Sequence, residues 1–414
     1  MAGPVSSLGY VNTERKFLKH IRDNVHGNIL LEPGQELGIE HTDVLTVKLA
    51  GLLHDVGHGP FSHTFERGFL PLVLQGSTWS HEEMSVKMID HIVDQHKIDL
   101  DSELLKKVKE MITSSPGHSS QREKRFLYDI VANGRNGIDV DKFDYIVRDS
   151  RACGLGCNFQ HERLMETMHV VDDEICYRAN DYLTVHKLFA TRADLHQTVY
   201  THAKVKAIEL MVIDALVKAN PFLQITSLIH QPSEFWKLDD SILKTIESSS
   251  QQELKESRDL IQRIRRRDLY QYCNEFSVPK ERLDHFRSIT PQDIVCSQTN
   301  GANLKEEDVV VSYVKIDLTR GRANPLGSVW MLQLTPNVVE YGSKEKFRIP
   351  NDCISHLLPA YCEDVIVRVY SREREQVEAV SNAFENYQLK TFGRKKQVHD
   401  TPEKKKRPKY FPSL

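Results

Sequence analysis

Three histidines and one aspartate fall within ten positions of one another, as His54, Asp55, His58 and His63. Imidazole nitrogens and carboxylate oxygens hold divalent transition metals and can leave positions open for water and phosphate. Neighbouring residues of a regular helix face different ways, so His54 and Asp55 reach one ion only where a helix ends or a turn follows. We therefore expect the apolar run 44–53 to be a helix that ends here, with Gly57 and Gly59 providing the break.

A lone His-Asp pair occurs by chance in many proteins, but the longer run His-Gly-Pro-Phe-Ser-His over 58–63 favours a chemical site. A second candidate segment, 136–149, contains four acidic residues on different faces of an expected helix, so they cannot all bind one ion: Asp139, Asp141, Asp144 and Asp149. Pairing with Lys142 or Arg148 on a solvated surface explains Asp144 well and Asp141 poorly. The segment therefore offers a third metal ligand among these acids.

The segments 53–63 and 136–145 resemble the HD-domain phosphohydrolases, in particular the animal deoxynucleoside triphosphate triphosphohydrolases that carry a SAM domain ahead of the HD domain. The resemblance runs from about Ile21 to about Ser371 and includes, at matching intervals, Phe126-Leu127-Tyr128, Thr191-Arg192, Leu195-His196 and Tyr200. It implies attack on the α-phosphorus of a deoxynucleoside triphosphate, which releases a deoxynucleoside and inorganic triphosphate.

The resemblance also implies a role for each matching residue. The metal, which is zinc, iron or manganese, would be held by His54, Asp55 and Asp141, and magnesium would accompany the nucleotide. His81, held by Glu82, would protonate the leaving 5′-oxygen, and His58 would act beside it. Substrate contacts would come from His63, Lys142, Tyr145, Asp149, Arg192 and Tyr200. Arg163 and Arg178 match positions that hold an activating nucleotide, GTP or a dNTP, between subunits of an oligomer.

Each of these residues also has an ordinary structural explanation. Any one of the histidines could be a core residue, although the set of four between His54 and His81 favours function. Arg192 could form an exposed ion pair with Asp194 or Glu162, and Tyr200 could be a core tyrosine. Arg163 and Arg178 would each pass as surface arginines.

The sequence departs from the family where the first metal histidine is expected, on a helix upstream of His54. In the family, two helices separate the segments that match residues 22–27 and 43–45. Here only residues 28–42 lie between them, and no Arg-Phe-Glu-His-Ser type segment is present. The SAM domain is also absent, and Asn180 and Ala203 replace family lysines. This pattern predicts a truncated, spliced or diverged relative. The alternatives are an impaired isoform that binds nucleotides or nucleic acid or modulates active subunits, and a different HD-domain hydrolase activity.

Composition predicts an ordinary soluble protein. The 414 residues are 40% hydrophobic and 27% charged with a net charge of −3, which argues against a strongly basic nucleic-acid binder or a membrane protein. The seven cysteines suggest reduced thiols of the nucleus or cytoplasm. The basic run 404–409 is typical of a nuclear import signal, a phosphate-binding tail or a solubilising end.

The periodicity predicts a mainly α fold, an HD-domain helical bundle with a small C-terminal α+β lobe. We expect an N-terminal segment over 1–42, the helical domain over 43–305, the lobe over 306–390 and a disordered basic tail over 391–414. Helical spacing continues over 241–272, alternation predicts strands over 309–317 and 365–369, and 328–334 predicts a third strand. A helix over 373–387 would close the lobe.

Overall fold

The computed structural model describes residues 37–113, 123–299, 303–319, 321–333, 346–350, 358 and 362–393. Most of the predicted N-terminal segment and the basic tail after residue 393 lie outside the described residues. Within the described residues, every helix falls short of the length or the apolar character that crossing a membrane requires. Six cysteines lie in this part of the chain, and all are free thiols.

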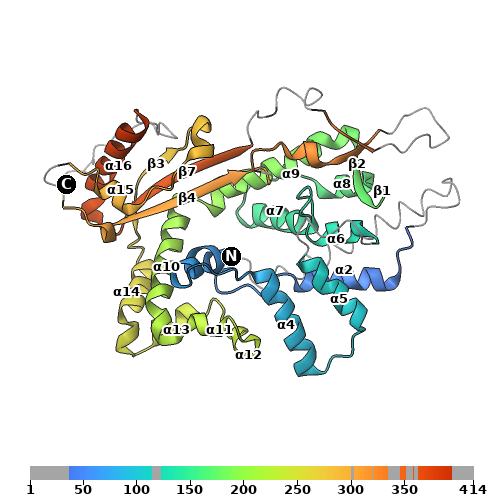
Figure 1. Cartoon of the computed structure of the whole chain (residues 1–414), viewed down its shortest axis with the longest axis horizontal. Coiled ribbons are helices and arrows are strands. Elements are labelled where there is room, and N and C mark those ends of the chain that lie inside the picture. The colour runs from blue at the N-terminus through green and yellow to red at the C-terminus, as the bar shows by residue number, and fades with distance from the viewer. Residues whose placement is uncertain are drawn as a thin grey trace, which may run out of the picture. The chain divides into compact units, whose positions relative to one another are not determined.

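Helices make up most of the described chain, which confirms the predicted fold class (Figure 1). The α-helices are α2 (His41–Leu53), α3 (Leu70–Val73), α4 (His81–His96), α5 (Ser102–Ile112), α6 (Arg125–Val131), α7 (Val140–Ala152), α8 (His161–Thr167), α9 (Tyr182–Leu195), α10 (Ala203–Leu223), α11 (Ile225–Leu228), α12 (Pro232–Phe235), α13 (Ile242–Ser248), α14 (Lys255–Arg265), α15 (Pro291–Val295) and α16 (Val377–Phe392). Two π-helical turns, η1 (Thr64–Phe69) and η3 (His196–Tyr200), directly adjoin α3 and α9.

The described strands form two small sheets. The first has the order β1-β2-β5-β6, and the second has the order β3-β7-β4. Their bounds are β1 (His169–Val171), β2 (Glu174–Arg178), β3 (Gln271–Ser277), β4 (Val309–Asp317), β5 (Trp330–Leu332), β6 (Lys346–Arg348) and β7 (Glu363–Ser371). In the first sheet β1 and β2 are an antiparallel hairpin, β5 runs parallel to β2 with Cys176 opposite Trp330, and β6 returns antiparallel to β5.

Two helices that carry site residues begin at side-chain caps. Ser80 Oγ accepts a hydrogen bond from the Glu83 amide at 3.2 Å and begins α4. Asp139 Oδ1 accepts from the Lys142 amide at 3.1 Å and begins α7. Such caps satisfy amides that have no partner in the first helical turn. They set where α4 and α7 start, and therefore the positions of His81 and Asp141 in the first turns.

The chain divides into two compact units. Of the described residues, the first contains those up to 202, within 209–266 and within 317–363, and the second contains those within 203–208, within 267–316 and from 364 to 393. In the first unit α2 packs against α5 and α6 (Figure 1), and the core includes Val47, Ala50, Val108 and Phe126.

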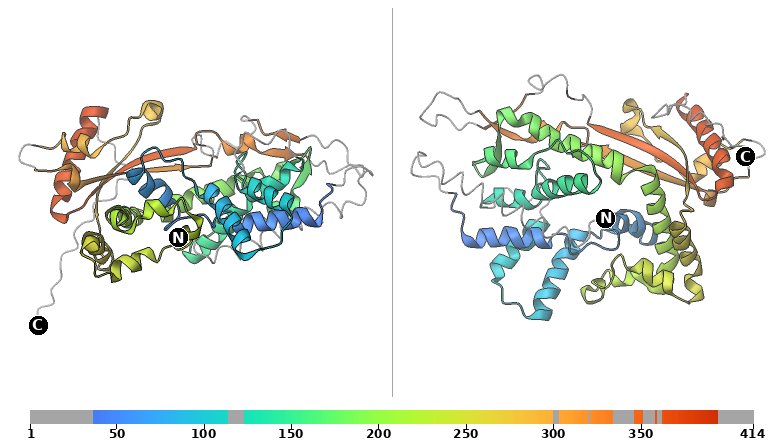
Figure 2. Two further views of the ribbon diagram at one scale, coloured as in Figure 1. Left: turned by 60° about the horizontal axis from the view of Figure 1, so that its bottom comes forward. Right: turned by 180° about the vertical axis from the view of Figure 1, so that it is seen from behind.

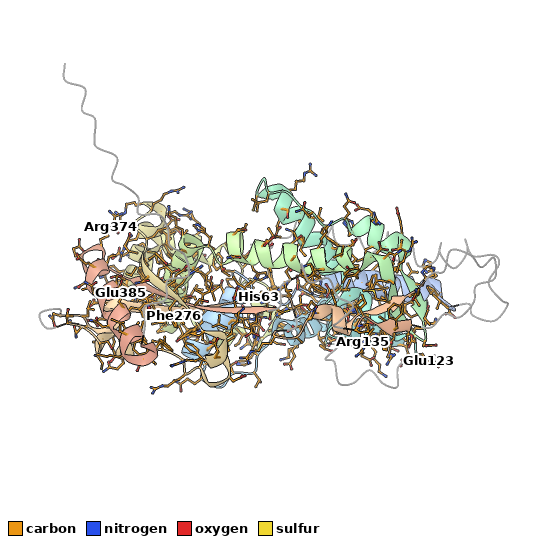
Figure 3. The ribbon with its side chains drawn as sticks, turned by 90° about the horizontal axis from the view of Figure 1, so that it is seen from above. His63, Glu123, Arg135, Phe276, Arg374 and Glu385 are labelled. Atoms are coloured by element: carbon orange, nitrogen blue, oxygen red, sulfur yellow. The ribbon has the colours of Figure 1, made fainter. Side chains whose placement is uncertain are left out.

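The second unit is a three-stranded sheet with α16 packed against β3 (Figure 2). Its core contains Phe276, labelled in Figure 3, together with Val367, Val380 and Phe384. β3 pairs with β7 in antiparallel register, with a bulge between Tyr272 and Asn274. This unit is the small α+β lobe expected from the sequence.

The units do not follow the predicted boundary between residues 305 and 306. Residues 267–316 belong with the lobe because β3 pairs with β7, and residues 317–363 join the helical unit because β5 pairs with β2. The helical spacing over 241–272 ends at Arg265, before β3 begins. Strands β4 and β7 confirm the predicted strands, and the strand predicted over 328–334 is present as β5.

A buried aromatic of the lobe gives a test of its core. Phe384 is fully buried, whereas Leu389 of the same helix is 42% exposed. We expect Phe384→Ala to lower the free energy of unfolding by about 3–5 kcal/mol because it leaves a cavity, while Leu389→Ala changes it by less than about 1 kcal/mol. Denaturant unfolding followed by circular dichroism measures both, and equal losses would show that α16 does not build this core.

Candidate active site

The His-Asp pair lies where α2 ends, as the sequence predicts. His54 is the C-terminal cap residue of α2, and its Nδ1 atom lies 2.8 Å from the carbonyl oxygen of Gly51. With Nδ1 donating to that carbonyl, Nε2 faces the Asp55 carboxylate at 3.2 Å. His58 Nε2 lies 3.5 Å from the other oxygen of Asp55. The turn therefore brings the side chains of the neighbours His54 and Asp55 together, which a continuous helix would not do.

The glycines of this turn serve a different purpose from the one predicted. Neither Gly57 nor Gly59 has a positive φ; the positive φ values fall on Phe61 (61°) and Ser62 (52°). A Cβ on Gly57 would lie 2.2 Å from the Ser85 amide nitrogen, and one on Gly59 would lie 2.4 Å from the Phe65 ring. The two glycines are required for close packing rather than for a left-handed backbone.

Ser85 fastens the turn to α4. Its hydroxyl accepts a hydrogen bond from the Gly57 amide at 2.8 Å and donates to the His54 carbonyl at 2.7 Å. The Ser85 side chain is completely buried. Through these bonds the end of α2 and the start of α4 are held together, and the histidines of both elements meet.

The three remaining histidines form a compact cluster. The rings of His58 and His81 are stacked, with centroids 3.9 Å apart and planes 9° apart. His63 meets both rings edge-on at 5.1 and 5.4 Å. Glu66 of η1 completes the cluster, because its Oε2 atom lies 2.9 Å from His81 Nδ1 and 3.4 Å from His63 Nδ1.

Glu66 is the residue that sequence reasoning missed. The prediction assigned the support of His81 to Glu82, but the Glu82 carboxylate is more distant from His81 Nδ1, at 3.4 Å, and its side chain is 44% exposed. Glu66 is closer and only 14% exposed. The available signal was the spacing of three between His63 and Glu66, which places both on one side of a helical turn.

The surroundings set the charge of the cluster. Burial lowers the pKa of His81 and lowers that of His63 to about 4, with help from the positive charges of nearby groups. The pKa of His54 shifts upward instead. Burial would lower it, but the hydrogen bond and charge of Asp55 outweigh burial and raise it to about 9. Burial alone would raise the pKa of Asp55, yet His54 and His58 hold it well below its usual range. His63 and His81 are therefore neutral near pH 7, and His54 carries a proton when no metal is bound.

The geometry also bears on metal binding. Within the described residues, the group of at least three ligand atoms close enough to share an ion consists of His58, His63, Glu66 and His81, all within 4.8 Å of one another. The predicted ligands His54, Asp55 and Asp141 are not part of that group, so their assignment stays a prediction. Asp141 lies close enough to His54 for its charge to contribute to the raised pKa of that imidazole.

The loop before α7 fixes the position of Asp141. Asn133 Oδ1 accepts from the amides of Arg135 and Asn136, and Asp139 accepts from the Asn133 amide at 3.2 Å. Lys142 Nζ lies 2.9 Å from Asp139. Burial and the neighbouring Asp139 raise the pKa of Asp141 to about 6, although His54 and Lys142 act in the opposite direction.

Several predicted substrate residues come together around η3. The Tyr200 hydroxyl donates to Asp149 Oδ2 at 2.6 Å, and its ring lies 6.4 Å from that of Tyr145. Arg192 forms neither of the ion pairs considered from the sequence; it donates to the Asp317 carbonyl at 2.8 Å. Because η3 is a π-turn, the eight residues from Arg192 to Tyr200 do not follow regular α-helical spacing.

The two predicted activator residues lie on neighbouring elements. Arg163 is on α8, with its side chain 66% exposed and its Nε atom 3.4 Å from Asp181. Arg178 ends β2, and β2 packs against α8. The structure therefore places these two arginines in one region of the first unit.

Comparison with known proteins agrees with this geometry. An HD domain matches residues 27–149, and an HD associated region matches residues 159–321. The deoxynucleoside triphosphate triphosphohydrolase SAMHD1 homolog of Dictyostelium discoideum is 38% identical over 352 residues, covering 84% of this chain and 66% of its own length. SAMHD1 of Gallus gallus and of Homo sapiens are each 32% identical, over 387 and 381 residues, with 62% and 60% of their lengths covered. The chain thus spans less than two thirds of the length of each relative.

The close approach at Gly57 predicts a strong effect of a single methyl group. We expect Gly57→Ala to lower the free energy of unfolding by about 1–3 kcal/mol, because the new Cβ meets backbone atoms of α4 that cannot move separately. Thermal or denaturant unfolding measures the loss.

Gly156 is a matched control, since a Cβ there would meet nothing within 4 Å. Gly156→Ala should change the unfolding free energy by no more than about 0.5 kcal/mol. A Gly57→Ala protein as stable as the Gly156→Ala protein would contradict the proposed packing.

Stability should also depend on the titration of His196. Burial and the charge of Arg192 lower the pKa of this imidazole from 6.5 to about 4. Between these pH values the unfolded chain binds a proton that the folded chain does not, so this contribution to stability is lost as pH falls from about 6.5 to 4.

In His196→Gln that proton-linked loss is removed. The parent protein should therefore lose stability relative to the variant below pH 6.5, while the difference between them stays constant at higher pH. Urea unfolding across this range measures the difference, and a constant offset at all pH values would disprove the linkage.

Proposed function

Because the chain belongs to the HD-domain family, we propose that it is a metal-dependent hydrolase that converts deoxynucleoside triphosphates to deoxynucleosides and inorganic triphosphate. The observation that carries this proposal is the meeting of the His-Asp pair with the cluster of His58, His63, Glu66 and His81. It places candidate metal ligands directly beside candidate proton donors. The relatives that bear this activity in their names support the substrate class.

The residues at the His-Asp pair fit a divalent metal. His54 Nδ1 is engaged by a backbone carbonyl, so its Nε2 lone pair and the Asp55 carboxylate face each other, and a proton or a cation must lie between them. We assign His54, Asp55 and Asp141 as the ligands of zinc, iron or manganese, with magnesium accompanying the nucleotide. A bound metal would lower the pKa of a water molecule and polarise a phosphate oxygen.

The histidine cluster supplies protons in this proposal. Glu66 and the more exposed Glu82 orient His81, which gives its proton to the leaving 5′-oxygen. Burial and the like charge of His58 lower the pKa of His81, so this imidazole would take up a proton beside the negative triphosphate and would then be a strong acid. His58 stacks on His81 and limits its rotation, and His63 approaches the substrate from the exposed side.

The basic and aromatic residues of α7, α9 and η3 would bind the nucleotide. Lys142 and Arg192 would neutralise the triphosphate. Burial alone would lower the pKa of Lys142, but Asp139 and Asp141 outweigh it and raise that pKa, so Lys142 stays charged. Tyr145 and Tyr200 would lie against the base and sugar. Asp149, which already accepts a hydrogen bond from Tyr200, would also accept one from a sugar hydroxyl.

Regulation and location are part of the same proposal. Arg163 and Arg178 would bind an activating GTP or dNTP between subunits of a homo-oligomer, and nucleic acid is a further candidate partner. The run 404–409, outside the described residues, would direct the protein to the nucleus, with the cytoplasm as the alternative location.

A product assay with a metal-ligand variant tests the hydrolase activity. The parent chain, incubated with dGTP and each other dNTP, should release inorganic triphosphate and retain a transition metal after dialysis. Asp141→Ala should lose the metal at this site and reduce turnover by more than about 100-fold, since both water activation and charge balance depend on it.

Asp94→Ala, at an exposed position on α4, is the control and should behave like the parent. Metal-dependent release of pyrophosphate or of monophosphate instead of triphosphate would assign a different HD-domain reaction. A folded parent with neither metal nor turnover would refute the proposed enzyme.

A further inference from the structure

Beyond the metal assigned to the His-Asp pair, we propose that His63, Glu66 and His81 form a second metal position for a zinc-class ion. The facing atoms already have suitable spacing: Glu66 Oε2 lies 2.9 Å from His81 Nδ1 and 3.4 Å from His63 Nδ1. A tetrahedral ion with bonds of about 2.0–2.1 Å needs ligand atoms about 3.3 Å apart. Two imidazoles and one carboxylate are a known ligand set for zinc.

His58 is suited to the fourth position. Its Nε2 atom faces Asp55 at 3.5 Å, and its Nδ1 atom is buried with no hydrogen-bond partner. A buried nitrogen without a partner is costly, and a carboxylate on the far side of an imidazole is the usual support of a metal-bound histidine. Because the His58 ring is parallel to that of His81, it must turn out of the stack before both nitrogens can point at one ion.

The cluster can be reached from solvent. The side chain of His63 is 55% exposed, whereas those of Glu66 and His81 are 14% and 10% exposed. His63 therefore lies at the entry of an otherwise buried ligand set, and its position in the molecule is labelled in Figure 3. When an ion binds His81 Nδ1, the single proton of the neutral imidazole would move to Nε2 by exchange with water.

One consequence rests on the proposed function. If His81 is the proton donor of the reaction, an ion bound to its Nδ1 atom and to Glu66 prevents the imidazolium from forming and removes its support. The second position would then be inhibitory. Metal binding itself does not depend on that activity.

Metal stoichiometry of the tag-free, full-length chain tests the proposal. Zinc retained after dialysis is measured by elemental analysis, and cobalt is added to the metal-free protein to record the visible bands of a tetrahedral site. His63→Ala and Glu66→Ala should each lose one zinc equivalent, or bind it at least about tenfold more weakly, and lose those bands. Asp141→Ala should keep this equivalent and lose only the one at the His-Asp pair.

Two variants on α4 serve as controls. Glu83 is exposed and His91 lies outside the cluster, so Glu83→Ala and His91→Ala should retain all the metal. Circular dichroism verifies folding, and the exposed position of His63 makes His63→Ala the variant to rely on if Glu66→Ala does not fold. Unchanged zinc in folded His63→Ala, or loss of all zinc in Asp141→Ala, overturns the second position.

The same measurements separate this proposal from the hydrolase. Zinc that depends on His63 would support the second position whether or not the protein shows turnover. Because that position would be inhibitory, turnover is measured with metal at the His-Asp pair alone, and its absence there would refute the proposed function. Turnover with metal that depends only on Asp141 would support the proposed function and refute the second position.

Discussion

The contact between the backbone of Gly57 and helix α4 is the constraint on which the candidate site depends. Glycine allows the turn after α2 to approach backbone atoms of α4 at a distance that no side chain would permit. Ser85 then joins the two elements through both a donated and an accepted hydrogen bond. Since His54 belongs to one element and His81 to the other, their separation is fixed by this contact.

Charge is the second organising feature. Asp55, Asp139 and Asp141 contribute negative charge to the site, and the structure balances it with His54 and Lys142. Asp55 raises the pKa of His54 to about 9, and burial together with Asp139 raises the pKa of Asp141 to about 6. The nearby histidine cluster shows the opposite tendency, because burial keeps His63 and His81 neutral.

The two π-turns give the site its local geometry. η1 carries Glu66 toward His63 and His81, and η3 ends with Tyr200 against Asp149. A π-turn adds a residue to a helical turn and is frequent at functional sites. Helical spacing counted along the sequence therefore fails across η3, between Arg192 on α9 and Tyr200.

The sequence by itself determined the helix that ends at Leu53, the strands β4 and β7, the mainly α class and the set of residues able to do chemistry. These follow from local periodicity, end signals and residue type, all of which are readable within a short window. Only the tertiary structure decided that Glu66 supports His81, that Gly57 is needed for packing and that β5 joins the first sheet. Those features depend on contacts between segments far apart in the chain, or on a π-turn that shifts the helical register, and no local pattern encodes either.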